Sequence, residues 1–239
     1  MTSTSYPGRE LELFAGAHRW KRYLAEEMAP FIGRRTLEVG AGIGGTTLPL
    51  ARATKQKAAV WVCLEPDPAL ARELRASIDR GVLPAACEVR CGDIRSVAER
   101  ESYDTILYVD VLEHILDDRA ELLRAASHLS AGGYLVVLSP AHRWLYSEFD
   151  SAVGHHRRYT RRSLRDVVPR ELEQTRLRYL DSCGLLASLA NRLLLKQALP
   201  SEREIAAWDR FLVGPSTWID RLTGHRVGKS LLGVWRRRS

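Results

Sequence analysis

The chain has 239 residues, of which 45% are hydrophobic and 27% are charged. This length and balance predict one globular domain with a full hydrophobic core and leave too little chain for two catalytic domains. The formal net charge of +7 comes from basic residues spread along the chain, so it favours an anionic partner only weakly.

No stretch of the sequence predicts membrane insertion. The longest apolar stretch, residues 184–195, contains Asn191 and Arg192 and is shorter than the roughly 20 residues of a spanning helix. The N-terminal residues are polar and lack the pattern of a secretory signal. We therefore expect a cytoplasmic protein.

Short apolar runs alternate with amphipathic segments through the first part of the chain, which predicts βαβ units around a parallel sheet. Strands are expected over residues 36–39, 59–64, 87–91, 103–108 and 134–139, and later over 175–180 and 229–235. A mostly helical insert, residues 183–227, precedes the last strand. The predicted fold class is α/β: a doubly wound, mostly parallel seven-stranded sheet with helices on both faces.

Two helix boundaries have local signals. Asp67 and Pro68 follow the second strand, where the carboxylate can cap a helix and the proline can occupy its first turn, so a helix is expected to about Asp79. Apolar residues at helical spacing up to Leu129 predict another helix, ended by the glycine pair at 132–133.

A glycine-rich turn follows the first strand. Gly40, Gly42, Gly44 and Gly45 let the backbone approach a ligand closely and lead into a helix N-terminus. The spacing also fits the dinucleotide fingerprint, and Glu65 lies roughly 20 residues further on, where an acid binds a ribose. Taken alone, the turn does not distinguish a nicotinamide cofactor from S-adenosylmethionine (SAM).

Three further features favour SAM. Glu38 is an acid just before the glycines, Asp93 and Ile94 follow the third strand, and Tyr-Val-Asp-Val-Leu-Glu-His follows the fourth at residues 108–114. All lie at carboxyl ends of predicted strands, where open α/β sheets bind ligands. With these segments, the chain resembles class I SAM-dependent methyltransferases, specifically the small-molecule group that includes the ubiquinone and menaquinone biosynthesis enzymes.

The resemblance is close over residues 36–139 and loose over the later strands. It implies that Glu38 binds the methionine amino group of SAM, that Asp93 pairs with the adenine amino group, and that residues 108–114 line the methyl end. The expected cofactor-binding residues are Glu38, Gly40, Gly42, Gly44, Glu65, Asp93, Ile94 and Asp110.

The acceptor side is expected after the fifth strand, where residues 144–159 gather aromatic and titratable groups. The end of this segment resembles a "GHxRRY" stretch of many bacterial members of the group. His155, Arg158 and Tyr159 are predicted to face the acceptor, and Tyr146 and Asp150 are second choices. A solvated basic loop is the alternative interpretation.

Methyl transfer from a sulfonium is an in-line displacement that needs alignment of the acceptor and sometimes a base. It requires no covalent nucleophile and no metal. His114 and His142 compete with His155 for the role of base, because an imidazole near pKa ~6.5 accepts protons at neutral pH. The sequence does not decide among the three.

The chain is interpreted as a single methyltransferase domain, residues 1–239, in three parts. Residues 1–35 are a predicted lid over the cofactor, or a helix that merely packs on the sheet edge. Residues 36–139 form the SAM-binding core, and residues 140–239 hold the acceptor segment, the insert and the last strands. The insert is a cap on the core, or an apolar surface for a membrane or a lipid-like acceptor.

The predicted function is transfer of a methyl group from SAM to an O or N atom of a small, anionic or amphiphilic acceptor. A nucleic-acid methyltransferase is the alternative, motivated by a pI near 9.5 and the basic runs 155–158 and 236–238. We expect no nucleic-acid partner, because the sequence contains no separate binding module. A third hypothesis is a SAM-binding protein without catalysis.

Overall fold

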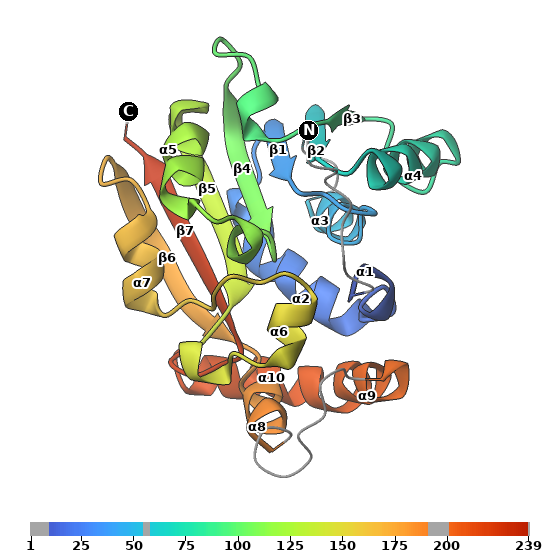
Figure 1. The fold of residues 1–239 in the computed structure, drawn as a ribbon, viewed down its shortest axis with the longest axis vertical. Helices are drawn as coiled ribbons and strands as arrows, with labels where there is room; N and C mark the ends of the chain where they lie inside the picture. Colours follow the sequence, from blue (N-terminus) through green and yellow to red (C-terminus); the bar gives the residue numbers. More distant parts are fainter. Residues whose placement is uncertain (1–9, 55–57, 191–200, 239) are drawn as a thin grey trace.

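The computed structural model describes residues 10–54, 58–190 and 201–238, whose strands form one seven-stranded sheet (Figure 1). The strand order is β3-β2-β1-β4-β5-β7-β6. The strands are β1 (Arg35–Val39), β2 (Val60–Glu65), β3 (Cys87–Cys91), β4 (Tyr103–Val109), β5 (Leu129–Pro140), β6 (Leu172–Leu180) and β7 (Ser230–Arg237). Only β7 is antiparallel to its neighbours, β5 and β6, which confirms the predicted mostly parallel sheet.

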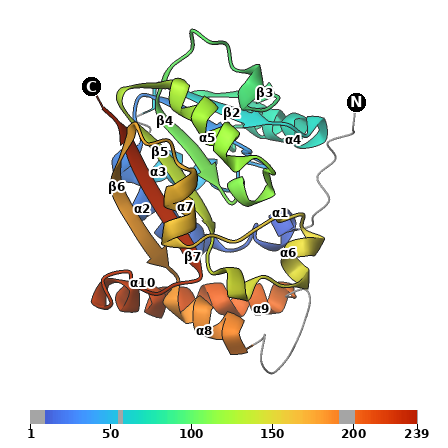
Figure 2. The same cartoon turned by 60° about the vertical axis from the view of Figure 1, so that its left-hand side comes forward.

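Helices cover both faces of the sheet, as predicted (Figures 1 and 2). One face carries α2 (His18–Met28), α3 (Thr47–Ala53) and α4 (Pro68–Asp79), and the other carries α5 (Asp118–Ser127) and α7 (Arg161–Val167). Successive residues of β2 therefore join different cores: Trp61 packs with the first group of helices and Val62 with the second. This burial of both faces is why β2 is almost continuously apolar.

The remaining helices lie at the end of the sheet toward which the parallel strands run (Figures 1 and 2). They are α1 (Glu10–Leu13), α6 (Glu148–Ala152), α8 (Ser182–Ala190), α9 (Glu202–Ala207) and α10 (Val213–Leu222). Single turns of 3₁₀-helix are η1 (Ala29–Phe31), η2 (Ile94–Ser96), η3 (Leu112–His114) and η4 (Arg143–Leu145), and η6 (Trp208–Leu212) is a π-helix.

The helix predicted after the second strand is confirmed, because its signals are local. Asp67 accepts hydrogen bonds at Oδ1 from the backbone N–H groups of Ala69 (2.7 Å) and Leu70 (3.3 Å), and Pro68 is the first helical residue. These contacts satisfy N–H groups that have no partner inside the helix.

The predicted boundary between the next helix and the fifth strand is wrong. α5 ends at Ser127, and β5 already begins at Leu129, which pairs with Tyr103. The glycine pair lies inside β5, at an irregular register, rather than at a helix end. A Cβ on Gly133 would lie 2.9 Å from the carbonyl oxygen of Ser130, so this strand needs glycine for close backbone approach.

The insert between β6 and β7 is helical in its described parts, and buried carboxylates connect it to the N-terminal helix. Asp209 of η6 accepts hydrogen bonds from the backbone N–H groups of Arg19 (3.1 Å) and Trp20 (2.8 Å), in the first turn of α2. Asp220 of α10 accepts from the hydroxyl of Tyr23 at 2.9 Å. The insert therefore caps α2, whose own N-cap residue makes no side-chain hydrogen bond to the helix. Residues 191–200, which include part of the predicted apolar stripe, lie outside the described residues.

Within the described part of the chain, none of the helices has the length and apolar character needed to cross a bilayer.

Candidate functional site

The glycine turn joins the carboxyl ends of β1 and β2. The backbone N–H groups of Gly40 and Ala41 donate to the carbonyl oxygen of Leu64 at 2.7 and 3.2 Å. Gly40, Gly42 and Gly44 have φ values of 68°, 55° and 79°, a region that side chains other than glycine rarely adopt. The positions therefore require glycine for the turn itself.

The N-terminal segment lies directly over this turn. A Cβ placed on Gly42 would lie 3.3 Å from the side chain of Leu11 in α1. The predicted position of the N-terminal segment next to the cofactor turn agrees with this contact. Its action as a lid remains a prediction.

Glu65, at the end of β2, is buried and bridges two backbone segments. Its Oε2 accepts from the N–H of Gly42 at 2.8 Å, and its Oε1 accepts from the N–H of Asp67 at 2.9 Å. Burial raises the pKa of this carboxyl, and the two N–H donors oppose the increase. The acid predicted to bind the ribose therefore lies next to the glycine turn.

Glu38 is buried beside the start of α3. The hydroxyl of Thr47 and the indole N–H of Trp61 both donate to Glu38 Oε2, at 2.8 and 2.9 Å. Burial raises the pKa of the Glu38 carboxyl to about 7, although both donors act in the opposite direction. A cation close to this carboxyl would favour its ionised form.

Asp93 follows β3 and caps η2, with its carboxylate close to the sheet end. Both of its oxygens contact the guanidinium of Arg95, and this hydrogen bonding lowers the pKa of Asp93. Ile94, predicted with it, is fully buried in the core between the sheet and α5. Its side chain therefore faces the core, and its contact with the cofactor remains a prediction.

Asp110 follows β4 with a positive φ of 53°. Its side chain is accessible to solvent, yet the surrounding protein desolvates the carboxyl and raises its pKa to about 6. His155 and Lys229 oppose this increase through their charges, so both lie near Asp110. Lys229, directly before β7, was not predicted at the site, because the fold and not the local sequence brings it near Asp110; its ammonium also pairs with the buried Asp181 at 3.5 Å.

His155 is buried between two carboxylates. Its Nδ1 lies 2.8 Å from Asp150 Oδ1, and its Nε2 lies 3.9 Å from Glu113 Oε1. Arg158 donates from Nε to the same oxygen of Asp150 at 2.8 Å. Burial alone would raise the pKa of Asp150, but hydrogen bonds from His155 and Arg158 lower it to about 2. Arg158 is thus occupied by Asp150, and the same carboxylate orients the imidazole.

His114 packs edge-on against His155, with 4.6 Å between the ring centroids. Burial lowers the pKa of His114 to about 4, so this imidazole is neutral at pH 7. Among the described residues, Glu113, His114 and His155 place one possible metal-ligand atom each within 4.8 Å of one another. Glu113 lies within the predicted segment 108–114 but was not itself predicted as a site residue. Its position next to His114 was the signal that could have indicated it.

His142 and Tyr146 are engaged with neighbouring backbone. His142 Nε2 lies 3.0 Å from the carbonyl oxygen of Gly228, and its ring stacks on Tyr179 at 4.8 Å. Burial lowers the pKa of His142. Tyr146 donates its hydroxyl to the carbonyl oxygen of His155 at 2.6 Å. Through these contacts, both side chains stabilise the fold of the segment at residues 144–159.

Tyr159, predicted to face the acceptor, instead lies in the hydrophobic core. Its hydroxyl donates to Asp118 Oδ2 at 2.6 Å, and its backbone pairs with Pro140 and His142 beside the end of β5. Burial raises the pKa of this hydroxyl well above its usual range. The segment returns to the core at Tyr159. Tyr159 therefore holds the end of the segment in place and stabilises the position of the histidines that precede it.

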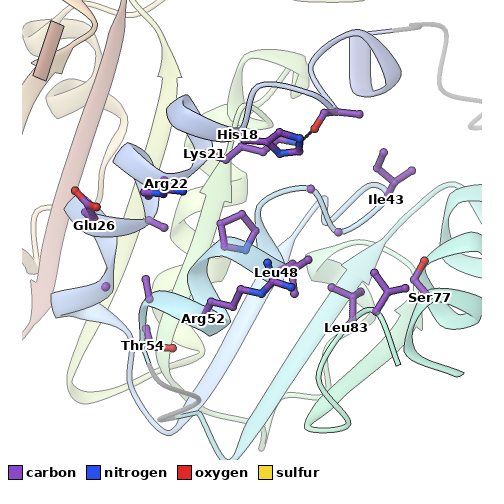
Figure 3. A pocket seen from close by; sticks show the side chains of 18 of the residues that line it. His18, Lys21, Arg22, Glu26, Ile43, Leu48, Arg52, Thr54, Ser77 and Leu83 are labelled. Atoms are coloured by element: carbon purple, nitrogen blue, oxygen red, sulfur yellow. Dashed lines mark hydrogen bonds between the residues drawn. The ribbon is translucent and has the colours of Figure 1, made fainter. Parts of the chain in front are cut away.

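A cavity of about 1050 Å³ lies elsewhere in the described structure. Figure 3 shows it between α2 and α3, where Lys21 and Arg22 lie opposite Leu48 and Arg52. It borders Gly44 and Gly45 but not Asp110, His114 or His155. The cavity is therefore behind the glycine turn and is not the predicted acceptor site.

Solved structures of methyltransferases have a fold similar to that of this chain. A putative sarcosine dimethylglycine methyltransferase from Galdieria sulphuraria aligns over 92% of this chain and 86% of its own, with a TM-score of 0.61 and 19% identity. The N-methyltransferase NodS from Bradyrhizobium japonicum, in complex with S-adenosyl-L-homocysteine, aligns over 99% and 94%, with a TM-score of 0.60 and 15% identity. At these identities the likeness shows the fold.

Sequence comparison adds a relative and a family. The ubiquinone biosynthesis O-methyltransferase of Bradyrhizobium diazoefficiens is 30% identical over 112 residues, which are 47% of this chain and 42% of that protein. The chain thus spans less than half the length of the curated relatives it matches. The family model of a methyltransferase domain, Methyltransf_23, matches residues 12–181, which hold the glycine turn and the acids at the strand ends. The chain therefore belongs to this methyltransferase family.

Proposed function

We propose that the chain transfers a methyl group from SAM to an oxygen or nitrogen atom of a small acceptor. The observation that carries the proposal is the arrangement at the carboxyl end of the sheet: the glycine turn with Glu38 and Glu65 lies on β1 and β2, and Asp110 follows the adjacent β4. The residues expected to bind the cofactor and the titratable residue Asp110 thus lie at the same end of the sheet.

The residues at the turn fit SAM. A positive-φ glycine backbone leaves room for the methionine portion, and an acid at the end of β2 suits the ribose hydroxyls. Glu38 suits the amino group, because a nearby ammonium offsets the cost of ionising a buried carboxyl. When bound, SAM supplies an electrophilic methyl group on a positively charged sulfur.

The protein orients the acceptor and removes its proton. The acceptor atom attacks the methyl carbon, the carbon–sulfur bond breaks, and the bonding electrons stay on sulfur. The acceptor proton passes to a base, for which His155 is our choice, because Asp150 fixes its Nδ1 and leaves Nε2 directed toward Glu113. His114 is a weaker base, since its pKa is lowered to about 4.

The acceptor is a small anionic or amphiphilic molecule in this proposal. The sequence relatives named ubiquinone biosynthesis O-methyltransferases support an acceptor hydroxyl. The groups near His155 include the carboxylates of Glu113 and Asp150, whereas a nucleic-acid duplex needs an open, positively charged surface.

Labelled SAM tests the proposal directly. The protein is incubated with SAM carrying an isotopically labelled methyl group, together with a metabolite extract or with total RNA. We expect label in a small-molecule fraction, and NMR of that product distinguishes O-methyl from N-methyl. Label found only in RNA would replace the proposal with the nucleic-acid alternative. Binding of NAD without any binding of SAM would contradict both.

A further inference from the structure

The helix α10 has its polar and apolar faces reversed relative to an ordinary surface helix. Its inward face carries Ser216 and Asp220, both fully buried and hydrogen-bonded. Its outward face carries Trp218, Ile219 and Leu222, of which Trp218 is 69% and Leu222 is 84% exposed. A helix that faces water normally buries its apolar stripe instead. Folding alone therefore does not account for the outward face.

The apolar surface continues beyond α10. Phe211 of η6 precedes it and is 62% exposed, and Leu186 of the neighbouring α8 is 64% exposed. Between Phe211 and Leu222 the helix rises roughly 16 Å, so the surface is several side chains long. We call Leu186, Phe211, Trp218, Ile219 and Leu222 the apolar ridge. Contiguous exposed apolar surface of this kind marks an interaction site.

The exposed charges of the stretch that carries most of the apolar ridge, residues 205–238, have one sign, whereas the preceding α9 carries the exposed acids Glu202 and Glu204. Within residues 205–238 the only carboxylate side chains are Asp209 and Asp220, and both are buried in hydrogen bonds to other parts of the chain. Arg210, Arg221 and Arg226 from the same stretch are exposed. The surface that the ridge presents is therefore apolar and positively charged, without exposed acids from its own segment.

This combination selects the partner. Two copies of the chain that met through the ridge would bring arginines against arginines, which repel. An anionic lipid surface satisfies both components: the aromatic and aliphatic side chains enter the headgroup boundary, and the arginines contact the phosphates. Tryptophan is favoured at this depth because its ring is amphipathic.

We propose that the apolar ridge docks the protein on the surface of an anionic membrane. α8, α9 and α10 lie at the end of the molecule toward which the parallel strands run (Figures 1 and 2). Docking through the ridge therefore places the carboxyl end of the sheet near the bilayer. The docking itself is independent of which acceptor the site uses.

Vesicle sedimentation of the whole chain without SAM tests the proposal. The probes are vesicles of phosphatidylcholine alone and of phosphatidylcholine mixed with phosphatidylglycerol. We expect binding to the anionic vesicles that weakens with salt, and a decrease of at least about tenfold in the partition coefficient for the double variant Trp218→Ser, Leu222→Ser. Arg221→Gln should weaken anionic binding roughly fivefold, the equivalent of about 1 kcal/mol per arginine at the surface.

The matched control is Leu123→Ser, which removes an exposed leucine of α5 on a different part of the molecule and should leave binding unchanged. Circular dichroism and thermal melting establish that each variant is folded. Binding to neither vesicle, or equal binding by the double variant and the wild type, would overturn the proposal. A concentration-dependent dimer in light scattering that the double variant abolishes, without vesicle binding, would assign the ridge to a second copy instead.

Discussion

The imidazole of His155 and the carboxylate of Asp150 form a 2.8 Å contact between two buried side chains, and Asp150 also accepts from Arg158. Ionised Asp150 is therefore favoured in the folded protein, where its pKa is lowered to about 2.

Asp150→Asn is predicted to destabilise the fold. The lowered pKa corresponds to about 2 kcal/mol of stability, which is present above the unfolded pKa and is lost as pH falls through the folded value near 2. The variant should lose this amount at pH 7, and the difference from wild type should shrink below about pH 4. Urea unfolding across this range measures the effect. A difference that is constant with pH would contradict the assignment.

Glu38 predicts a pH dependence of cofactor affinity. Its pKa of about 7 means that the carboxyl is largely protonated at pH 5.5, whereas an ammonium group binds the ionised form. The affinity for SAM should therefore rise on the order of tenfold between pH 5.5 and 7. Glu38→Gln should bind weakly at both pH values. Calorimetry checks this, and an equally steep rise in the variant would exclude Glu38 as the cause.

Gly42→Val is predicted to abolish SAM binding while the chain remains folded. A branched side chain at φ 55° is strained, and it also enters the space below Leu11 where the turn approaches a ligand. The matched control is Gly81→Val, because Gly81 has a φ of 71° and open space around it. The control carries similar backbone strain but should bind SAM normally. Similar losses in both variants would indicate strain alone.

Tyr159 and His155 should separate in kinetics. Tyr159→Phe removes a buried hydrogen bond to Asp118 and should lower the free energy of unfolding by about 1–3 kcal/mol, with kcat unchanged. His155→Gln should lower kcat about 100-fold or more, with the dissociation constant of SAM unchanged. Denaturant unfolding, steady-state rates and calorimetry distinguish the two roles. A wild-type kcat in folded His155→Gln would assign the base elsewhere.

Asp209→Ala is predicted to loosen α2. The carboxylate caps the first turn of that helix, so its loss should cost about 1 kcal/mol and increase hydrogen exchange at the amides of Arg19 and Trp20. Asp67→Ala, which removes the cap of α4, should lower stability similarly but leave exchange in α2 unchanged. Unaltered exchange of the two amides in Asp209→Ala would show that the cap is energetically irrelevant.

The sequence predicts the sheet and the cofactor turn well, because their signals are local. Asp67 caps the helix that it directly precedes, and the glycines of the turn are adjacent residues that need unusual φ values. The boundary at Leu129 could not be predicted in the same way. There, pairing with Tyr103 of another strand overrides a helical spacing of apolar residues.

The acceptor segment could be located but not oriented from sequence. His155 and Tyr159 are four residues apart, yet one joins the carboxylate cluster and the other the core. The directions of these two side chains depend on contacts with Asp118 and Glu113. Both partners belong to the segment after β4, so the spacing of residues 155–159 carries no information about them. The same holds for Asp209, whose partners in α2 are 189 and 190 residues away.

The inner position of β7 has a consequence for biosynthesis. This strand lies between β5 and β6 and hydrogen-bonds to both. In the sequence, however, it is the last strand, and a long insert separates it from β6. During translation, the facing edges of β5 and β6 therefore keep unpaired backbone groups until residues 230–237 have left the ribosome. Open strand edges of this kind promote association between chains. A nascent chain stalled within the insert is thus more prone to aggregate than the finished chain, in which β7 closes the sheet.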